Sequence, residues 1–386
     1  DTNGGAFEVD LPAGSAGAIV SIQDYRNTFD THSLTVDPNG SEKINGGGAG
    51  DPVILNTEGQ GVTFVYIDST IGWRSVQDNT YATIGSSFIS ATGGTVSCSG
   101  NCRIHTFTGP GTFCVSVTGS PANNVVSYMV VAGGAGGGGS EGGAWGGAGG
   151  GGAGGFREFK SPVTPYTASP LDGNPGGTQI SVSATAFPIT VGAGGSAGPG
   201  PNGPTLGSGA SGSNSIFSTI TSAGGGGGGG SPTSAVVGVA GGSGGGAGGR
   251  TNQAGGSGNT PPVTPAQGFD GGRNAPSGSP SSIDAGGGGG GASAVGGTAT
   301  NNNGGPGGNG VTTEITGTPT AYAGGGGGGS EAQNAKPGGT GGGGASGNPG
   351  TAGTANTGGG GGGNHCAAPG GAAGGSGVVI IRYKSQ

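Results

Sequence analysis

The sequence predicts a mainly β protein with almost no α-helix, in which small N-terminal β modules precede a bundle of polyglycine II helices closed by terminal strands. Short segments that alternate apolar and polar residues fill the first third, as in half-buried strands. Glycine accounts for 109 of the 386 residues, and 90 of these follow residue 131, against a usual share of about 7%. Apolar, strand-like segments flank this glycine-rich part on both sides.

Residues 1–76 are predicted to form a compact N-terminal β module. Strand patterns cover Ala6–Leu11, Ala18–Ile22, Ser33–Val36 and Val62–Ile67. The turn Asp37–Gly40 has a clear mechanism, because proline presets its own φ and Asn-Gly accepts positive φ. So small a core needs help from neighbouring parts or from oligomerisation.

Residues 77–131 are predicted to form a β-hairpin connector. Arg103–Phe107 and Thr112–Val117 flank the turn sequence Thr-Gly-Pro-Gly, and the strand-like segment Val125–Val131 follows. Cys98 and Cys102 enclose Ser-Gly-Asn, a spacing that fits a small-loop disulfide bond; the alternative is that both remain free or buried thiols. Cys114 lies in a strand pattern and is expected to be buried.

Residues 132–386 are predicted to form the polyglycine-helix domain, against the alternative of a flexible, low-complexity tether. A polyglycine II helix rises about 3.1 Å per residue with three residues per turn and makes no internal hydrogen bonds. Neighbouring helices can therefore satisfy its outward N–H and C=O groups. The flanking strands Val125–Ala132 and Val378–Tyr383 favour this ordered form. The glycine runs are 133–139, 146–155, 224–230, 241–249, 286–291, 324–329, 338–344, 358–363 and 370–377.

The polar segments between the runs, such as 200–215, 250–285 and 292–303, are predicted to be loops at the ends of the bundle, and binding residues are expected there. Aromatic side chains and arginine are common anchors of binding surfaces. A structural alternative is that Phe156, Phe187, Phe217 and Tyr322 cap the bundle, which we favour for Phe187 and Phe217. The candidate binding residues are Phe156, Arg157, Phe159, Tyr166, Arg250, Phe269, Arg273 and Tyr322.

Several functional classes are unsupported by the sequence. Charged residues make up 8% of the chain and the net charge is −7, without the basic stripe that nucleic-acid binding requires. No apolar run reaches the roughly 18 residues of a membrane span. Nucleophile-elbow and phosphate-loop motifs, paired carboxylates and metal-ligand spacings do not stand out, so we expect neither an enzyme nor a cofactor or metal site. The start at Asp1 suggests a processed form or a fragment.

Several motifs resemble the glycine-rich domain of bacteriophage tail-fibre and related virion proteins. Arg103–Thr108 is similar to the strand that often precedes this domain, and Asp1–Phe7 with Leu11-Pro12 is similar to small β modules of marine phage structural proteins. The resemblance implies a layered sandwich of polyglycine helices whose distal loops recognise host receptors. The main motifs are Tyr128–Gly134, Ile189–Gly195, the runs Gly286–Gly291 and Gly324–Gly329, and Gly377–Tyr383.

The resulting expectation is a receptor-binding adhesin of a phage fibre or virion surface, located outside the cell. Its partners would be a host surface receptor, either protein or glycan, and other fibre or virion proteins. A homo-oligomer is expected, and the likeness to fibres suggests a trimer. Two alternatives are a self-assembling extracellular filament or coat subunit and, less favoured because the intervening segments are irregular, an ice-binding protein.

Overall fold

The computed structural model describes residues 2, 4–80, 88–120, 123–140, 146–200, 207–231, 236–249, 252–275, 285–300, 303–331, 334–365 and 370–385. The chain divides into two compact units, Asp1–Ser87 and Phe88–Gln386. The described residues contain strands and irregular segments and no α-helix, which confirms the predicted fold class.

The first unit consists of two three-stranded sheets around one core. One sheet has the order β1 (Phe7–Asp10), β3 (Leu34–Asp37), β4 (Val53–Leu55), and the other has the order β2 (Ile19–Gln23), β5 (Gln60–Asp68), β6 (Gly72–Thr80). Leu34 and Val36 from the first sheet meet Phe64 and Trp73 from the second, and all four are buried. The strands predicted from alternation in residues 6–67 are therefore present, each facing this core with every second residue.

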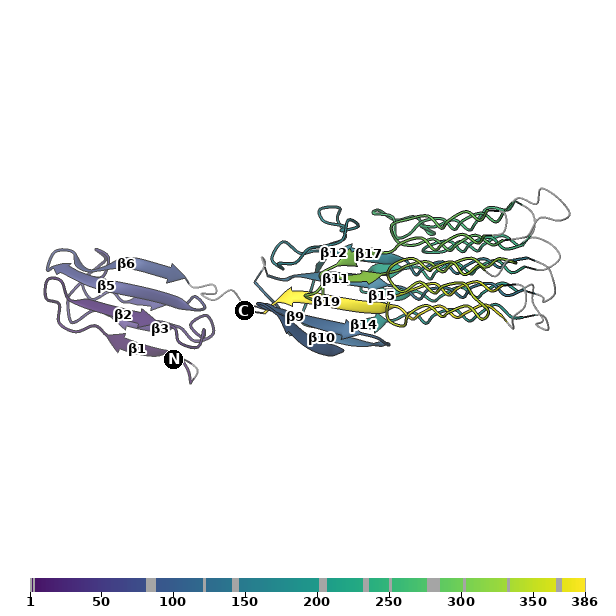
Figure 1. The fold of residues 1–386 in the computed structure, drawn as a ribbon. Coiled ribbons are helices and arrows are strands. Elements are labelled where there is room, and N and C mark those ends of the chain that lie inside the picture. Colours follow the sequence, from purple (N-terminus) through teal and green to yellow (C-terminus); the bar gives the residue numbers. More distant parts are fainter. Residues whose placement is uncertain are drawn as a thin grey trace. The chain divides into compact units, whose positions relative to one another are not determined.

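Two larger sheets form one end of the second unit (Figure 1). The five-stranded sheet has the order β16 (Ile220–Ser222), β15 (Ser215–Phe217), β14 (Ala186–Thr190), β10 (Gly111–Val117), β7 (Ser90–Thr92). The six-stranded sheet has the order β12 (Phe156–Phe159), β11 (Val125–Val131), β19 (Val378–Lys384), β9 (Cys102–Phe107), β8 (Thr95–Ser99), with β13 (Ile180–Ser181) also paired to β11. A separate hairpin joins β17 (Val311–Thr313) to β18 (Thr320–Tyr322).

The central strands β11 and β19 are buried on both faces. Tyr128 and Val130 belong to the core cluster that also holds Phe113 and Phe217 of the five-stranded sheet, whereas Met129 and Val131 belong to a second cluster on the opposite face. This double burial explains the nearly continuous apolar sequences of both strands. The antiparallel pairing of β11 with β19 confirms that the strands flanking the glycine-rich region meet.

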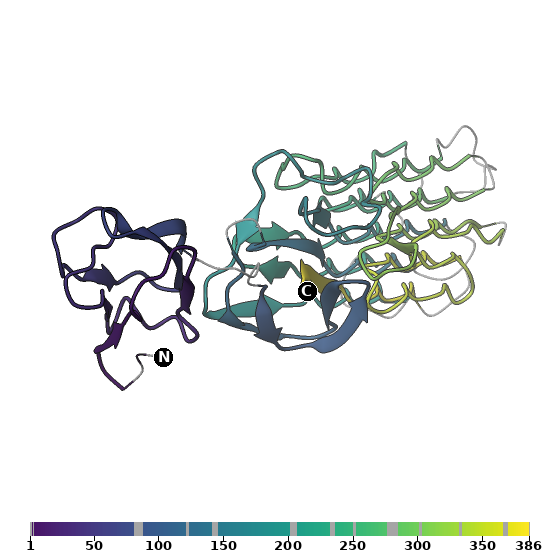
Figure 2. The same ribbon diagram turned by 90° about the vertical axis from the view of Figure 1, so that its left-hand side faces the viewer.

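Straight glycine-rich segments run side by side away from these sheets (Figures 1 and 2). We call each such segment a strut. The described struts span 132–140, 146–155, 192–199, 207–214, 223–231, 236–241, 243–249, 252–258, 269–275, 285–292, 294–300, 303–310, 323–330, 334–340, 343–347, 350–354, 358–365 and 370–377.

Hydrogen bonds between struts repeat every three residues, as a polyglycine II lattice requires. In the first strut, 132–140, N–H groups three residues apart donate to the same neighbouring strut. Consecutive N–H groups therefore donate to three different neighbours. Ala132, Ala135 and Gly138 donate to strut 146–155, Gly133, Gly136 and Gly139 to strut 207–214, and Gly134 and Gly137 to strut 370–377. Carbonyl groups of this strut accept from struts 192–199, 223–231 and 358–365, so it has six hydrogen-bonded neighbours.

A strut's position in the lattice determines where it must be glycine. Strut 285–292, surrounded like the first, is buried throughout, and a Cβ atom added at Gly289 would lie 2.0 Å from the carbonyl oxygen of Gly151. Strut 303–310 lies at the surface and reads Asn-Gly-Gly-Pro-Gly-Gly-Asn-Gly, with Pro306 and Asn309 exposed. Glycine runs therefore form the interior, and mixed sequences form the outer layer.

This rule corrects two predictions about the glycine-rich region. The segments 200–215, 250–285 and 292–303, predicted to be loops, contain outer struts, because one side of an outer strut is free to carry side chains. The glycine run 338–344 is not one strut, because the chain turns within it at Gly341 and Gly342, which have φ values of 96° and 95°.

The connector predicted at 77–131 also differs from the observed structure. The hairpin forms one strand earlier than predicted, between β8 and β9, whereas β9 and β10 lie in different sheets. Of the two alternatives for Cys98 and Cys102, the structure has the free thiols. Cys98 faces solvent opposite Arg103, and Cys102, on the other face of the hairpin, is buried opposite Ser99. Cys114, expected to be buried, is exposed.

The lattice makes interior glycines sensitive to one added methyl group. In the variant Gly326→Ala, the new Cβ atom would lie 2.0 Å from the carbonyl oxygen of Gly361. Because that atom belongs to a hydrogen-bonded backbone, we expect the free energy of unfolding of the second unit to fall by about 2–4 kcal/mol, measured by denaturant titration.

The matched control is Gly109→Ala, since a Cβ atom at Gly109 meets nothing within 4 Å. This control should change the free energy of unfolding by less than about 0.5 kcal/mol. Equal effects of the two substitutions would contradict the close packing of the struts.

Candidate functional site

The aromatic residues expected to bind a receptor are mostly buried where the struts meet the sheets. Phe156 and Phe159 lie in β12, and Tyr322 lies in β18; they are 1%, 2% and 6% exposed. Their prediction as loop residues is corrected: they pack in the two core clusters beneath the lattice. Because the struts offer almost no side chains, large aromatic residues fill the space at their sheet ends, as was expected for Phe187 and Phe217.

Tyr166 and Arg157 lie in the same region. The guanidinium of Arg382 lies 5.1 Å from the ring centroid of Tyr166, which is a cation–π distance. Arg382 is itself buried, and it donates hydrogen bonds to the carbonyl oxygens of Pro165 at 2.9 Å and Ile315 at 3.1 Å. Arg157 is only half-buried on β12. Tyr166 is thus held by Arg382, which pins the segment after β12 to the sheet.

Glu158 is a buried acidic residue in the same region. One carboxylate oxygen accepts a 2.9 Å hydrogen bond from the Ser169 N–H group, and the other accepts one from the Thr313 hydroxyl. Burial raises the pKa of Glu158, although these hydrogen bonds oppose the shift. Glu158 therefore joins the segment after β12 to the β17–β18 hairpin, which is a structural role.

Phe269 and Arg273 remain available on the side of the bundle. Both lie on the outer strut 269–275, where Phe269 is 36% exposed, and Arg273 donates a 3.1 Å hydrogen bond to the Asn252 side chain. The neighbouring strut 294–300, joined by a bond from Gly296 N–H to the Asp270 carbonyl, exposes Val295. Arg250 lies outside the described residues. The two struts thus form a mixed aromatic, aliphatic and charged surface, which we call the Phe269 face.

At the end away from the sheets, polar side chains close the lattice. Ser140, Ser231, Ser330 and His365 are almost completely buried. The Ser330 N–H group donates a 2.9 Å hydrogen bond to Nδ1 of His365. Since Nδ1 accepts, the neutral ring carries its proton on Nε2. These residues were missed in the sequence because each directly follows a glycine run or its final asparagine, where a single polar residue gives little signal.

Burial lowers the pKa of His365. The second buried histidine, His105, lies in β9 between the sheets. Its Nδ1 atom is 2.7 Å from the Gly93 carbonyl oxygen and its Nε2 atom is 3.0 Å from the Tyr383 hydroxyl. A carbonyl can only accept, so Nδ1 of His105 carries the proton. Burial lowers the pKa of His105 as well.

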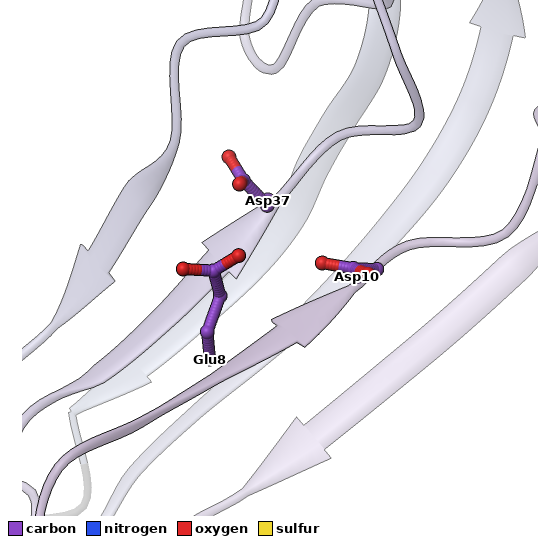
Figure 3. A group of neighbouring side chains, drawn as sticks. All are labelled: Glu8, Asp10 and Asp37. Atoms are coloured by element: carbon purple, nitrogen blue, oxygen red, sulfur yellow. The ribbon is translucent and has the colours of Figure 1, made fainter.

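The first unit carries a cluster of three carboxylates. Glu8 and Asp10 on β1 and Asp37 on β3 have oxygen atoms within 4.8 Å of one another (Figure 3). The pKa of Glu8 is raised, first by a hydrogen bond with the Asp37 carboxyl group and then by the charge of Asp37. The cluster is a local excess of negative charge that a cation, either a metal ion or a basic side chain, would neutralise.

Comparison with known proteins identifies the family of the glycine-rich part of the chain. A family model described as a glycine-rich domain matches residues 106–384. A search of curated proteins found none that matches the chain. Among the described residues, no helix has the length and apolar character needed to cross a membrane.

The polar layer at the far end should make the bundle sensitive to acid. Because the folded-state pKa of His365 is lowered, its contribution to stability is complete above the ordinary histidine pKa of about 6.5 and is lost as the pH falls toward the folded-state value. Protonation of Nδ1 also removes the hydrogen bond from Ser330. We therefore expect the hydrogen-exchange protection of the Ser330 amide to fall as the pH drops below about 6.5.

The variant His365→Asn is the control, since its side-chain oxygen can still accept a hydrogen bond but does not titrate in this range. Protection of the Ser330 amide should then change little with pH. Identical pH profiles in the two proteins would show that His365 does not control this end of the bundle.

Proposed function

We propose, from the premise that the chain belongs to the glycine-rich domain family, that it is an extracellular attachment protein of a bacteriophage fibre or virion surface. In this proposal it binds a host surface receptor, either protein or glycan, and assembles with other virion proteins as a homo-oligomer, for which the fibre resemblance suggests a trimer. No catalytic activity is assigned to it. The proposal goes beyond the family, which establishes only the glycine-rich domain.

One observation supports attachment most directly: the lattice is a rigid support with two unlike ends. Its sheet end is closed by buried aromatic residues such as Phe156 and Tyr322. At the other end, the described struts stop at polar residues such as Ser140 and Ser231, which form a β-bridge with each other. Segments between rigid elements can vary in sequence without disturbing the scaffold, which suits recognition.

The observed burial changes which residues the proposal uses. Phe156, Phe159 and Tyr322 are too deeply buried to contact a receptor. The contacts are instead assigned to residues 276–284, which follow strut 269–275 in the sequence, and to the Phe269 face. Phe269 and Arg273 combine the aromatic and guanidinium groups that are common in binding surfaces.

The filament alternative is supported by a different feature, the exposed aliphatic residues of the first unit, such as Ile19 and Val76. The ice-binding alternative is not proposed. Strut 350–354 exposes Thr351 and Thr354, but the adjoining strut 370–377 exposes Ala373, so the threonine repeat does not extend across these two struts.

Adsorption to cells tests attachment. The fluorescently labelled full chain is incubated with a panel of bacterial strains, and bound protein is measured by flow cytometry. In one variant, residues 276–284 are replaced by a glycine-serine sequence of equal length, and in another Phe269→Ser is combined with Arg273→Ser. We expect adsorption to at least one strain, reduced about tenfold or more by one of these variants, because binding energy concentrates in few residues.

The matched control is Val96→Ser on β8, which removes an exposed aliphatic side chain far from both proposed surfaces in the sequence. It should adsorb like the unmodified chain. Adsorption that none of the changes reduces would contradict the assigned contact surfaces, and adsorption to no strain would count against attachment.

A further inference from the structure

The first unit presents two outward sheet faces of different character. On the sheet β2–β5–β6, Val20, Phe64 and Trp73 point into the core. The alternate residues point outward, and the register places Ile19 beside Val65 and Val65 beside Arg74. Four aliphatic residues and one arginine form one part of this outward surface, next to the polar pair Ser21 and Thr63. We call this part the Arg74 face: Ile19, Val65, Ile67, Arg74 and Val76.

The Arg74 face is unusually apolar for an exposed sheet. Ile19 is 66% exposed, Val76 60% and Ile67 43%, and Arg74 is also exposed. Single exposed apolar side chains are ordinary, but several on one three-stranded sheet are typical of an interaction surface.

The opposite sheet, β1–β3–β4, carries the carboxylate cluster on its outer face. Leu34, Val36 and Leu55 point into the core, so the alternate positions point outward. In the strand register, Thr35 on β3 lies between Glu8 on β1 and Ile54 on β4. Asp10 on β1 lies beside Asp37 on β3. Ile54 is 58% exposed. We call this surface, formed by Glu8, Asp10, Thr35, Asp37 and Ile54, the acidic face.

Charge is distributed very unevenly along the chain. Residues 1–87 hold eleven of its 18 acidic residues and three of its 11 basic residues, which are Arg26, Lys43 and Arg74. Arg74 is the one basic residue on the Arg74 face as defined. The two outer faces of the unit are thus complementary: one offers a guanidinium among aliphatic side chains, and the other offers three crowded carboxylates beside an isoleucine.

We propose that the Arg74 face of one copy docks on the acidic face of a second copy. The guanidinium of Arg74 would form paired hydrogen bonds with the carboxylates, a geometry that arginine favours. It would also relieve the repulsion among Glu8, Asp10 and Asp37. Ile19 and Val76 would cover Ile54 and remove apolar surface from water. This inference does not depend on the attachment function.

The symmetry of such a contact determines the assembly. The two faces belong to the two sheets that enclose a single core, so they point away from each other. A contact between unlike patches is heterologous, and when it does not close into a ring it produces an open chain of subunits. Opposed faces therefore give a linear stack of first units.

The size of the faces makes each contact weak. Three strands about 4.8 Å apart and five residues of about 3.3 Å each give a face of roughly 14 by 17 Å. Each face then covers only about 240 Å², well below the roughly 800 Å² per partner of a stable specific interface, so a single contact is weak and transient. Stacking becomes significant where subunits are held close together, because linked sites raise the effective concentration.

Sedimentation velocity of the full chain at increasing concentration tests the proposal at low ionic strength. The unmodified chain should form a concentration-dependent series of oligomers that dissociates in high salt, because exposed charge pairs are screened. Arg74→Glu should reduce the association constant at least about tenfold, since it places like charges together. The double variant Glu8→Lys with Asp10→Lys should do the same from the other face.

Mixing the two variants gives the sharpest result. Each retains one intact face, and the charges of the two altered faces are also opposite, so an equimolar mixture should associate although neither variant does so alone. Arg103→Glu on β9 changes the net charge as Arg74→Glu does, but outside the first unit, and should assemble like the unmodified chain. A chain that stays monomeric at all concentrations, an Arg74→Glu protein that assembles normally, or a mixture that fails to pair would each overturn the proposal.

Discussion

The second unit depends on one constraint, which is that a polyglycine II helix cannot satisfy its own backbone hydrogen bonds. Every N–H and C=O group must find a partner on another strut, so no strut is stable alone. The lattice must therefore be positioned from outside. The pairing of β11 with β19 does this, because it places the first and last struts side by side, where the Gly134 N–H group donates to the Gly375 carbonyl at 2.9 Å.

The same constraint explains the composition of the chain. A strut with six neighbours has carbonyl oxygens about 2 Å from any added Cβ atom, as at Gly289 and Gly326. Such a strut must be glycine, despite the entropy that glycine loses on ordering. An outer strut has a free side and keeps Pro306 or Val295 there. Uninterrupted glycine runs thus indicate interior struts of the bundle, and the mixed segments between them indicate outer struts.

Much of the fold could be predicted because its signals are local: alternation in residues 6–67, glycine runs, and the strands at each end of the glycine-rich region. The pairing of strands could not be predicted in the same way. β9 pairs with β19, which lies more than 270 residues later in the chain, and no local sequence pattern indicates that contact. The positions predicted for several candidate binding residues were wrong for a related reason. Successive struts alternate in direction, so a residue's end of the bundle depends on the struts before it. Phe156 follows a strut that returns to the sheets and is buried there, whereas Phe269 begins an outer strut and keeps an exposed edge.

The two ends of the lattice consequently face different demands. At the sheet end, strands β11 and β12 and their aromatic residues continue the chain, so substitutions there disturb the core. At the far end, where the lattice stops, Ser140, Ser231, Ser330 and His365 close it with buried polar groups. This polar layer closes the described part of the lattice at the end away from the sheets. Sequence variation is least costly on the free sides of the outer struts, where residues such as Pro306 and Val295 already replace glycine, so those surfaces can change while the scaffold stays the same.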